Sequence, residues 1–392
     1  MHLLFLTFTY YPDLGAGSFR SKALIDNLIK KIGPNDKIEL ITTYPSRYER
    51  YFVENIEIKN NENLIIHRIK LPNYFNNNLR MIINFIYYFY KSISITRKKN
   101  FDIVFATSSR LMTGVLGAVI SKKNNSKYYL DIRDIFLLGV SDLYPKIINF
   151  FLYPILLKME KFMINTADTV NLISEGFIPY FIDKYPKKNY NYFTNGIDEE
   201  FLNLNNSKVN TDKNRQIEIL YAGNVGEGQG LSKIIPELAM SLENKAIIKI
   251  IGDGSDLDKL KKRTKNLNNV KIVNPMSREK LIQHYKTTDI LFLHLNKFET
   301  FKTVLPSKIF EYAAIGKPIL AGVSGYAKKF LEKEIYNSYI FEPCDVKNAY
   351  EKFNKINLKF ADRNNFILKF SRNKISENMS NEILSLNENY KQ

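Results

Sequence analysis

Short runs of β-branched residues alternate with longer amphipathic stretches along the 392-residue chain, and this alternation constrains the fold more than any other feature. Strands separated by helical segments form βαβ units, whose strands pair in parallel. Continuous apolar runs such as Ile290–Leu293 are typical of strands that are covered on both faces. The sequence therefore predicts an α/β fold with parallel sheets. The expected strands are Leu3–Phe8, Ile38–Thr42, Leu64–Arg68, Ile103–Ala106, Tyr128–Asp131, Thr169–Ile173, Ile217–Tyr221, Ile247–Ile251, Val270–Val273, Ile290–Leu295 and Pro318–Ala321.

The series of strands starts twice, which predicts two domains of similar size. A polar stretch rich in Asn, Lys, Ser and Asp separates the two series. We expect two doubly wound, Rossmann-like domains, residues 1–201 and 217–370, joined by a linker at 202–216. A C-terminal helix is expected at 371–392. Ligands of open α/β sheets bind at the carboxyl ends of the strands, so a cleft between the two domains is the expected site.

The composition is that of a globular protein, with 45% apolar and 25% charged residues. The single cysteine, Cys344, excludes an intrachain disulfide and a cysteine zinc cluster, and it favours a reducing compartment. No run reaches the roughly 18 apolar residues of a membrane span. We interpret Met1–Tyr11 as a buried strand rather than a signal peptide, because it has no basic n-region and no small-residue cleavage site. The apolar stretch Ile147–Leu157 is expected to pack in the core, with a membrane contact as the alternative.

The net charge of +17 leaves three interpretations open. They are a solvated basic face, an anionic membrane surface and a nucleic-acid surface. Residues 63–101 contain no Asp or Glu, seven Lys or Arg and eight Phe or Tyr. Aromatic rings at the headgroup level and nearby cations suit a peripheral membrane face. The residues of this mixture are Tyr74, Phe75, Phe85, Tyr87, Tyr88, Phe89 and Tyr90, with Arg80, Lys91, Arg97, Lys98 and Lys99.

A loop with two glycines joins the first expected strand to a helical pattern. Gly15, Ala16 and Gly17 lie in this loop, and Arg20 follows them. Glycines let a ligand approach the backbone closely, and the free N–H groups at a helix N-terminus attract a diphosphate. An ordinary turn with Ser18 as the helix N-cap is the alternative.

Glycine-rich loops follow strands of the second half in the same way. Gly223, Asn224 and Gly226 come directly after an expected strand, and four glycines fall within Gly223–Gly230. That number exceeds what a turn needs, so we expect a ligand to approach this backbone. The residues expected to line the same edge after the next two strands are Gly252, Asp253 and Gly254, and Asn274, Pro275 and Met276.

The most specific motif spans Thr303–Pro318. A Pro-Ser pair opens a helix that Gly316 closes. Lys308 and Glu311 are three residues apart and therefore lie on one face of this helix. We interpret Lys308 and the loop amides as phosphate ligands and Glu311 as a ligand of sugar hydroxyls, with a surface ion pair as the alternative. The loop residues are Thr303, Val304, Leu305 and Ser307.

Charged residues also end one strand of the first half. Asp131, Arg133 and Asp134 stand within four residues, and charges at a strand end are costly to bury without a purpose. We favour a site role over a structural ion pair. The four histidines have no metal-ligand spacing, and no Walker, G-x-S-x-G or H-E-x-x-H motif occurs, so no metal site is expected.

The order of these motifs resembles that of the GT-B glycosyltransferases, in particular the family-4 retaining enzymes. The resemblance covers nearly the whole chain. The Gly-Asn-x-Gly-x-x-Gln-Gly and Pro-Ser-Lys-x-x-Glu-Tyr patterns look like those of a bacterial subgroup that includes N-acetyl-fucosamine transferases of O-antigen and capsule synthesis. The segments that carry the resemblance are Gly15–Arg20, Ala167-Asp168, Asn195-Gly196-Ile197-Asp198, Gly223–Gly226, Ile251–Gly254 and Pro306–Pro318.

The resemblance implies a GT-B fold whose C-terminal helix returns to the N-terminal domain. It implies an acceptor-binding first domain and a donor-binding second domain. The reaction would transfer a sugar, an N-acetylated or deoxy hexose, from a UDP-linked donor with retention and without a metal or other cofactor. The chain departs from the family where Thr303 replaces the first member of Glu-x7-Glu, whose second member is Glu311. Asn224 and Gln229 stand where many relatives carry Arg and Lys to grip the diphosphate, with Lys308 as a substitute.

In this interpretation each candidate residue has a role. The Gly15–Gly17 and Thr303–Leu305 amides, with Arg20 and Lys308 as cations, would stabilise the leaving diphosphate. Asp134 would orient the acceptor or relay its proton. The neighbouring arginine, Arg133, would hold an acceptor phosphate.

The expected acceptor is a polyprenyl-diphosphate-linked glycan at the anionic inner face of the plasma membrane. The protein would then be cytoplasmic and peripheral on that membrane, with no specific nucleic-acid partner. Two other classes stay open: a nucleotide-sugar 2-epimerase with the same fold, and a basic binding module without enzymatic activity. The Pro-Ser-Lys-x-x-Glu helix favours transfer over epimerisation. The sequence contains no RNA- or DNA-reading motif, which disfavours a nucleic-acid module.

Overall fold

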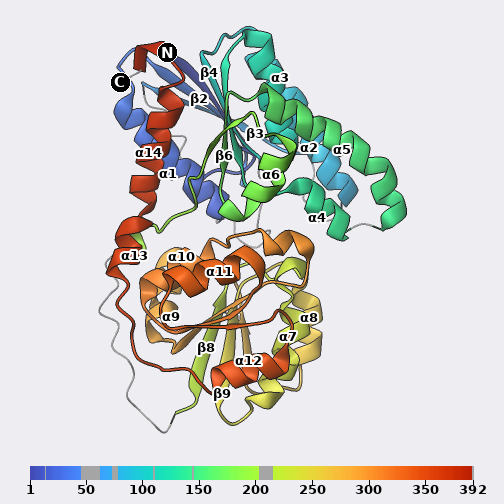
Figure 1. Ribbon diagram of the computed structural model, residues 1–392, viewed down its shortest axis with the longest axis vertical. Helices are drawn as coiled ribbons and strands as arrows, with labels where there is room; N and C mark the ends of the chain where they lie inside the picture. The colour runs from blue at the N-terminus through green and yellow to red at the C-terminus, as the bar shows by residue number, and fades with distance from the viewer. Residues whose placement is uncertain are drawn as a thin grey trace. The chain divides into compact units, whose positions relative to one another are not determined.

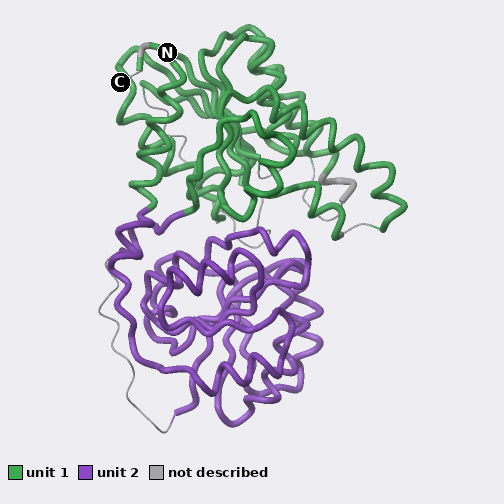
Figure 2. Tube along the Cα trace, viewed as in Figure 1, with its two compact units in different colours: residues 1–195, 372–392 green, residues 196–371 purple. Residues whose placement is uncertain are grey.

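The computed structural model describes residues 1–13, 15–45, 62–72, 78–108, 111–143, 145–202 and 215–390. The chain forms two compact units (Figure 2). Unit 1 comprises Met1–Asn195 and Arg372–Gln392, and unit 2 comprises Gly196–Ser371. The chain thus passes between the units before the expected linker at 202–216, most of which lies outside the described residues.

Within its described residues, unit 1 contains a seven-stranded parallel sheet in the order β3-β2-β1-β4-β5-β6-β7. The order reverses between β1 and β4, which makes that pair the topological switch point of the sheet. The strands are β1 (His2–Leu6), β2 (Lys37–Thr43), β3 (Leu64–Ile69), β4 (Ile103–Ser108), β5 (Lys127–Ile132), β6 (Thr169–Leu172) and β7 (Asn189–Asn191).

One face of this sheet is covered by two helices from opposite ends of the chain (Figure 1). These helices, α1 (Ala16–Lys31) and α14 (Arg372–Leu384), pack against each other. Leu3 and Phe5 form a core with Met379 of α14. The predicted return of the C-terminal helix to the first domain is therefore confirmed.

Alternate side chains of the strands point to the other face, because a strand has a period of two. Tyr128 of β5 donates to the carbonyl oxygen of Gly114 in α3 at 2.6 Å. The remaining helices of the unit are α2 (Asn78–Thr96), α3 (Leu111–Asn124), α4 (Phe136–Leu143), α5 (Lys146–Thr166) and α6 (Ile178–Lys184), with short 3₁₀ helices η1 (Glu175–Phe177) and η5 (Glu388–Tyr390).

In the described part of unit 2 a six-stranded parallel sheet has the order β10-β9-β8-β11-β12-β13, and its switch point lies between β8 and β11. The strands are β8 (Ile217–Ala222), β9 (Ala246–Ile251), β10 (Val270–Val273), β11 (Ile290–His294), β12 (Ile319–Gly322) and β13 (Ser338–Phe341).

Successive residues of β8 face different cores. Leu220 packs with the helices α9, α10, α11 and α13, and Tyr221 packs with α7, α8 and α12. Because both faces are covered, the strands are mostly apolar, and β8, β9 and β10 each contain one charged residue. The helices are α7 (Leu231–Ser241), α8 (Leu257–Thr264), α9 (Arg278–Thr287), α10 (Lys308–Ile315), α11 (Gly325–Glu334), α12 (Val346–Phe353) and α13 (Asn364–Lys369), with 3₁₀ helices η2 (Glu199–Phe201), η3 (Glu227–Gln229) and η4 (Glu299–Lys302).

Two sequence expectations about apolar residues are wrong. The first half of α5, within the stretch Ile147–Leu157 that we expect in the core, is exposed. Conversely, Phe85 and Tyr88 of the expected membrane face are buried, because they pack in aromatic contact with Phe8 after β1. Two other members of that face, Tyr74 and Phe75, lie outside the described residues.

Within the described ranges, none of the helices has the length and apolar character that crossing a bilayer needs. In the same residues, no group of three or more His, Cys, Asp or Glu side chains could hold a metal ion.

Candidate functional site

The carboxyl edge of the unit 2 sheet gathers the predicted glycine loops. Gly223 donates its N–H to the carbonyl oxygen of Ile251 at the end of β9, at 2.8 Å. Val225 donates to Asp253 at 2.9 Å, and Gly252 donates to Val273 at the end of β10, at 3.1 Å. The loops after three neighbouring strands are thus joined by backbone hydrogen bonds. They lie beside the switch point, where open α/β sheets bind ligands.

Lys308 lies directly on the glycine loop. A Cβ atom on Gly223 would collide with Nζ of Lys308, and the φ of Gly223 is +135°, which other residues rarely adopt. The ammonium group also lies over the Tyr221 ring, 5.2 Å from its centroid. Glycine at 223 therefore lets a cation from α10 reach the backbone after β8. The structure joins two motifs that are 85 residues apart in the sequence.

Glu311, one turn further along α10, is half-buried and held by two neighbours. Tyr285 of α9 donates its hydroxyl to Oε2 of Glu311 at 3.4 Å. Nη2 of Arg278 lies 3.7 Å from Oε1. Burial raises the pKa of the Tyr285 hydroxyl well above its ordinary value, as does the Glu311 charge, so the hydroxyl stays a donor. The carboxylate of Glu311 is thereby oriented from the α9 side.

Arg278 is itself fixed by carboxylates of unit 2. It pairs with Asp198, and its Nε lies 3.5 Å from Oε2 of Glu200. Its guanidinium lies over the Phe201 ring, 4.8 Å from the centroid. Burial alone would lower the pKa of Arg278, but the charges of Glu311, Asp198 and Glu200 raise it overall. The Asn195–Asp198 segment of the sequence resemblance thus supplies a partner to this arginine.

His294, the last residue of β11, ties this strand to the loop after β8 and to the segment after β13. Nδ1 of His294 donates to the carbonyl oxygen of Gln229 at 2.6 Å, and Nε2 accepts from the backbone N–H of Cys344 at 2.9 Å. Because Nε2 accepts, the proton of the neutral ring is on Nδ1. Burial lowers the pKa of His294 to about 4, and the hydrogen bond to Gln229 opposes that shift. His294 is therefore neutral at physiological pH.

Asn296, in the loop after β11, adds hydrogen bonds to the loop after β8. Its backbone N–H donates to Gly228 at 2.9 Å, and Nδ2 donates to Glu227 at 2.9 Å. Oδ1 accepts from Lys233 of α7 at 3.2 Å. The switch point of unit 2 is consequently a preorganised pair of loops.

The remaining predicted donor residues of unit 2 occupy the same edge. Nδ2 of Asn224 donates to Oε1 of Gln229 at 2.8 Å, so these two side chains bond to each other. Oγ1 of Thr303 donates to the carbonyl oxygen of Thr300 at 2.8 Å. The other members are the exposed Asn274, the half-buried Asp253, Gly254, Pro275, Met276, Val304 and Ser307, and the buried Leu305. Gly226 is buried and donates its N–H to Oε1 of Gln229 at 3.2 Å.

In unit 1, Arg20 is part of a buried network rather than an accessible cation. It is 4% exposed and forms a two-point ion pair with Asp131, with Nε–Oδ2 and Nη2–Oδ1 distances of 3.2 and 3.1 Å. It also donates to the carbonyl oxygens of Phe193 and Thr194. Asn171 donates to Asp131 at 2.7 Å. The structure thus gives Arg20 a structural partner where the sequence suggests a phosphate ligand.

The unit 1 glycine loop meets Arg133 instead. A Cβ atom on Gly17 would collide with the Arg133 guanidinium, so the glycine allows this close approach. Gly15 is the N-cap of α1, whose first turn has no acidic residue. Ala16 is the first residue of that helix. Asp134, the residue after Arg133 along the chain, is exposed.

Sequence reasoning missed Arg278, Tyr285 and His294. Arg278 follows the predicted Asn274–Met276 loop by two residues, and that proximity was the available signal. Its pairing with Glu311 bridges 33 residues, so no local pattern reveals it. His294 ends an apolar strand, where a buried histidine without ligand spacing gives no functional signal.

Comparison with known proteins defines the class of fold. Sucrose-phosphate synthase from Thermosynechococcus elongatus is similar at a TM-score of 0.73, with 12% identity and 98% of each chain covered. The structure of Anabaena Alr3699/HepE in complex with UDP is similar at a TM-score of 0.61, with 14% sequence identity. The match covers 99% of this chain and 98% of that chain. The lipopolysaccharide outer core galactosyltransferase WaaB is similar at a TM-score of 0.62, with 15% sequence identity. The match covers 98% of this chain and 99% of that chain. The chain has the GT-B fold.

A protein-family model also matches most of the second unit. Residues 204–369 match the model described as Glycosyl transferases group 1. The matched range includes all the loops that meet around Lys308 and Glu311. A search among curated proteins gives no match.

Proposed function

We propose that the chain is a retaining glycosyltransferase that takes a sugar, an N-acetylated or deoxy hexose, from a UDP-linked donor. The observation that carries this proposal is the position of Lys308 on the Gly223 backbone at the switch point of unit 2. Cations and backbone amides at the carboxyl edge of such a sheet suit a diphosphate. The group 1 glycosyl transferase match over the same residues supports it.

The donor would be held by residues of unit 2. Lys308 and the amides of the Gly223–Gly226 and Thr303–Leu305 loops would bind the diphosphate. Glu311, oriented by Arg278 and Tyr285, would accept hydrogen bonds from sugar hydroxyls. The loops after β9 and β10, Gly252–Gly254 and Asn274–Met276, would flank the base.

Transfer then needs stabilisation of the leaving group. The bond between the anomeric carbon and the diphosphate breaks while the acceptor oxygen bonds to that carbon on the same face. The electron pair leaves with the diphosphate, and Lys308 and the loop amides stabilise the charge. The acceptor proton passes to the departing phosphate oxygen, either directly or with Asp134 as a relay.

We propose a polyprenyl-diphosphate-linked glycan as the acceptor, in surface polysaccharide synthesis on an anionic inner membrane face. Arg133, on the Gly17 backbone, would hold an acceptor phosphate. The net charge of +17 supports an anionic partner. In this role the protein is cytoplasmic, peripheral on the membrane and independent of a metal.

A thermal-shift panel with UDP, GDP, dTDP and NAD tests the donor site. A bound nucleotide raises Tm by mass action, so we expect UDP to raise it with increasing concentration. Lys308→Ala should reduce the rise, while the matched control Lys329→Ala, at an exposed position of α11, should keep it. No shift with any nucleotide would contradict the proposal. Conversion of a UDP-sugar without any acceptor would instead identify an epimerase.

A further inference from the structure

The N-terminal half of α5 is apolar and exposed around its circumference. Phe150 is 76% exposed and Ile147 is 72% exposed. A helix that is hydrophobic all round belongs in an apolar environment, either a core or a membrane. From Leu143 to Met159 the sequence contains no Asp or Glu. The exposed large apolar side chains are Ile147, Ile148, Phe150, Phe151, Leu152, Tyr153 and Ile155.

One stripe of α5 leads from these residues into a pocket. Steps of three or four residues place side chains on one face of a helix. The stripe spans about 16 Å from Phe150 to Lys161, at 1.5 Å per residue. It therefore changes from apolar to cationic along a length comparable with a lipid molecule. Its members are Ile147, Phe150, Pro154, Leu157, Lys161 and Asn165.

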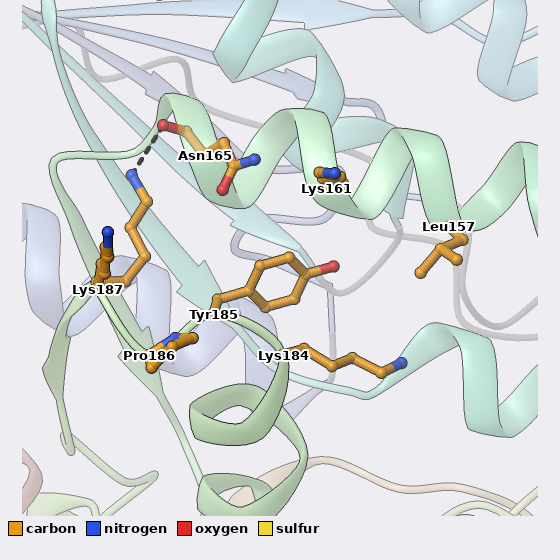
Figure 3. A pocket seen from close by; sticks show the side chains of 8 residues that line it. Leu157, Lys161, Asn165, Lys184, Tyr185, Pro186 and Lys187 are labelled. Carbon is orange, nitrogen blue, oxygen red and sulfur yellow. Dashed lines mark hydrogen bonds between the residues drawn. The ribbon is translucent and has the colours of Figure 1, made fainter.

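The pocket has a volume of about 510 Å³ and lies between α5 and the segment from α6 to β7 (Figure 3). Figure 3 shows its lining side chains, which include four lysines. Lys188 is anchored to the carbonyl oxygens of Asn165 and Ala167, both at 2.8 Å. The full lining is Leu157, Lys161, Asn165, Lys184, Tyr185, Pro186, Lys187 and Lys188.

Contacts around the pocket preserve its positive charge. Nζ of Lys184 lies over the Tyr180 ring, 3.8 Å from the centroid, and Lys161 and Lys187 are exposed. The nearby Glu160 is buried and accepts hydrogen bonds from Tyr180 and Tyr185. Burial raises the pKa of Glu160 and those hydrogen bonds oppose the shift. The hydrogen bonds of the carboxylate thus come from tyrosine hydroxyls, while Lys184 interacts with it only through its charge.

An apolar helix that ends in a lysine pocket has the chemistry of an amphiphile with a phosphate head group. A second copy of this chain fits it less well, because a symmetric contact would bring the same lysines together. We propose that α5 docks unit 1 on an anionic phospholipid surface. Its apolar half enters the acyl boundary, and the lysine pocket holds phosphate head groups. The inference deepens the membrane contact of the proposed function and needs no donor site.

A tryptophan reporter tests the inserted element, because the chain contains no Trp. Phe150→Trp places one indole on α5, and Ile86→Trp, at a 59% exposed position of α2, is the matched control. With vesicles of phosphatidylcholine and roughly one-third phosphatidylglycerol, we expect emission of the α5 reporter to shift to the blue. Brominated lipids should quench it, and the α2 reporter should change less. A shift of the α2 reporter alone would overturn the proposal.

Flotation of the full chain with the same vesicles measures the contributions to affinity. Phe150→Ser with Ile155→Ser should weaken vesicle binding at least tenfold. The matched control on α2, Ile82→Ser with Ile86→Ser, also replaces two exposed apolar side chains and should weaken vesicle binding less than threefold. Lys161→Gln with Lys187→Gln should weaken binding roughly tenfold. The same double exchange at Lys261 and Lys262 of α8 should leave it within about twofold.

Other outcomes separate the possible occupants. Displacement from vesicles by millimolar inorganic phosphate would assign the pocket to a free anion and overturn the lipid assignment. Dimers that dissociate in the Phe150→Ser and Ile155→Ser double variant would assign α5 to a second copy. Absence of vesicle binding while UDP still raises Tm would overturn this inference and leave the donor site standing.

Discussion

In each unit a cationic side chain lies against a glycine that follows the first strand in chain order, β1 or β8. The two units differ in whether the neighbouring charged residues are buried. In unit 1, Arg133 lies on Gly17, while Arg20 and Asp131 form a buried pair beneath. In unit 2, Lys308 lies on Gly223, while Glu311 stays half-buried at the edge. The difference teaches that a charged residue near a strand end can serve as a buried structural partner, as Arg20 does, or can lie on a glycine loop at the sheet edge, as Lys308 does.

The largest effect is expected when the buried ion pair of unit 1 is broken. Arg20→Met leaves Asp131 charged and buried, which should cost about 3–5 kcal/mol of unfolding free energy. Urea denaturation measures this cost, and UDP binding to the folded variant should persist. The control Lys22→Met, in an exposed pair with Asp26, should cost less than about 1 kcal/mol. Unchanged stability with lost UDP binding would make Arg20 a phosphate ligand instead.

The next effect concerns His294, which joins the end of β11 to the loop after β8. The pKa of His294 in the folded state is about 4, below the ordinary 6.5, because the buried ring resists charging. Its contribution is therefore complete above pH 6.5 and is lost as pH falls toward 4, by at most about 3 kcal/mol.

Unfolding free energies of the wild type and His294→Asn between pH 7 and 4 measure this loss. Carboxylates titrate in both proteins, so the difference between the two curves isolates His294. The difference should shrink as pH falls. His284→Asn, at a half-buried position of α9, is the control. Parallel curves for wild type and His294→Asn would contradict the role of burial.

A smaller effect is expected at Lys308. In the proposed site, Lys308→Gln would remove a charged hydrogen bond to the diphosphate, which is worth about 1.5–3 kcal/mol, so the Kd of UDP should rise roughly 10- to 100-fold. Titration calorimetry measures it. Lys329→Gln, at an exposed position of α11, should leave the Kd unchanged. An unchanged Kd in Lys308→Gln would place the phosphates elsewhere.

The smallest effect distinguishes sugar from nucleotide. Arg278→Gln should leave UDP affinity within about twofold, because Arg278 acts through Glu311. It should weaken binding of the UDP-sugar about fivefold, equivalent to roughly 1 kcal/mol for a mispositioned hydrogen bond. Competition between UDP and UDP-sugars on each variant measures the split. Equal losses for both ligands would show that Arg278 contacts the nucleotide.

Regular alternation made most of the fold predictable. Every expected strand occurs within two residues of its predicted bounds. β7 and β13 were missed because Asn189–Asn191 is polar and Ser338–Phe341 is short, so neither shows a clear apolar run. The exposed half of α5 was misplaced in the core because an apolar run does not reveal whether other elements cover it.

The candidate site was only partly predictable. Glycines and a helix start are local signals, so Gly223 and Lys308 could be found in the sequence. Their contact depends on β8 and α10 meeting at one sheet edge, which only the fold defines. For Arg20 the local pattern was misleading, because its partners Asp131 and Phe193 come from distant parts of the chain.

The central claim is that the donor site belongs to unit 2. Hydrogen–deuterium exchange with and without UDP is the most direct test of this claim. The account predicts UDP-dependent protection of peptides covering Gly223–Gly230 and Thr303–Glu311. It predicts no change around Arg20 and Asp131, whose network is complete without ligand. Protection confined to the unit 1 peptides, with none at Gly223–Gly230, would contradict it.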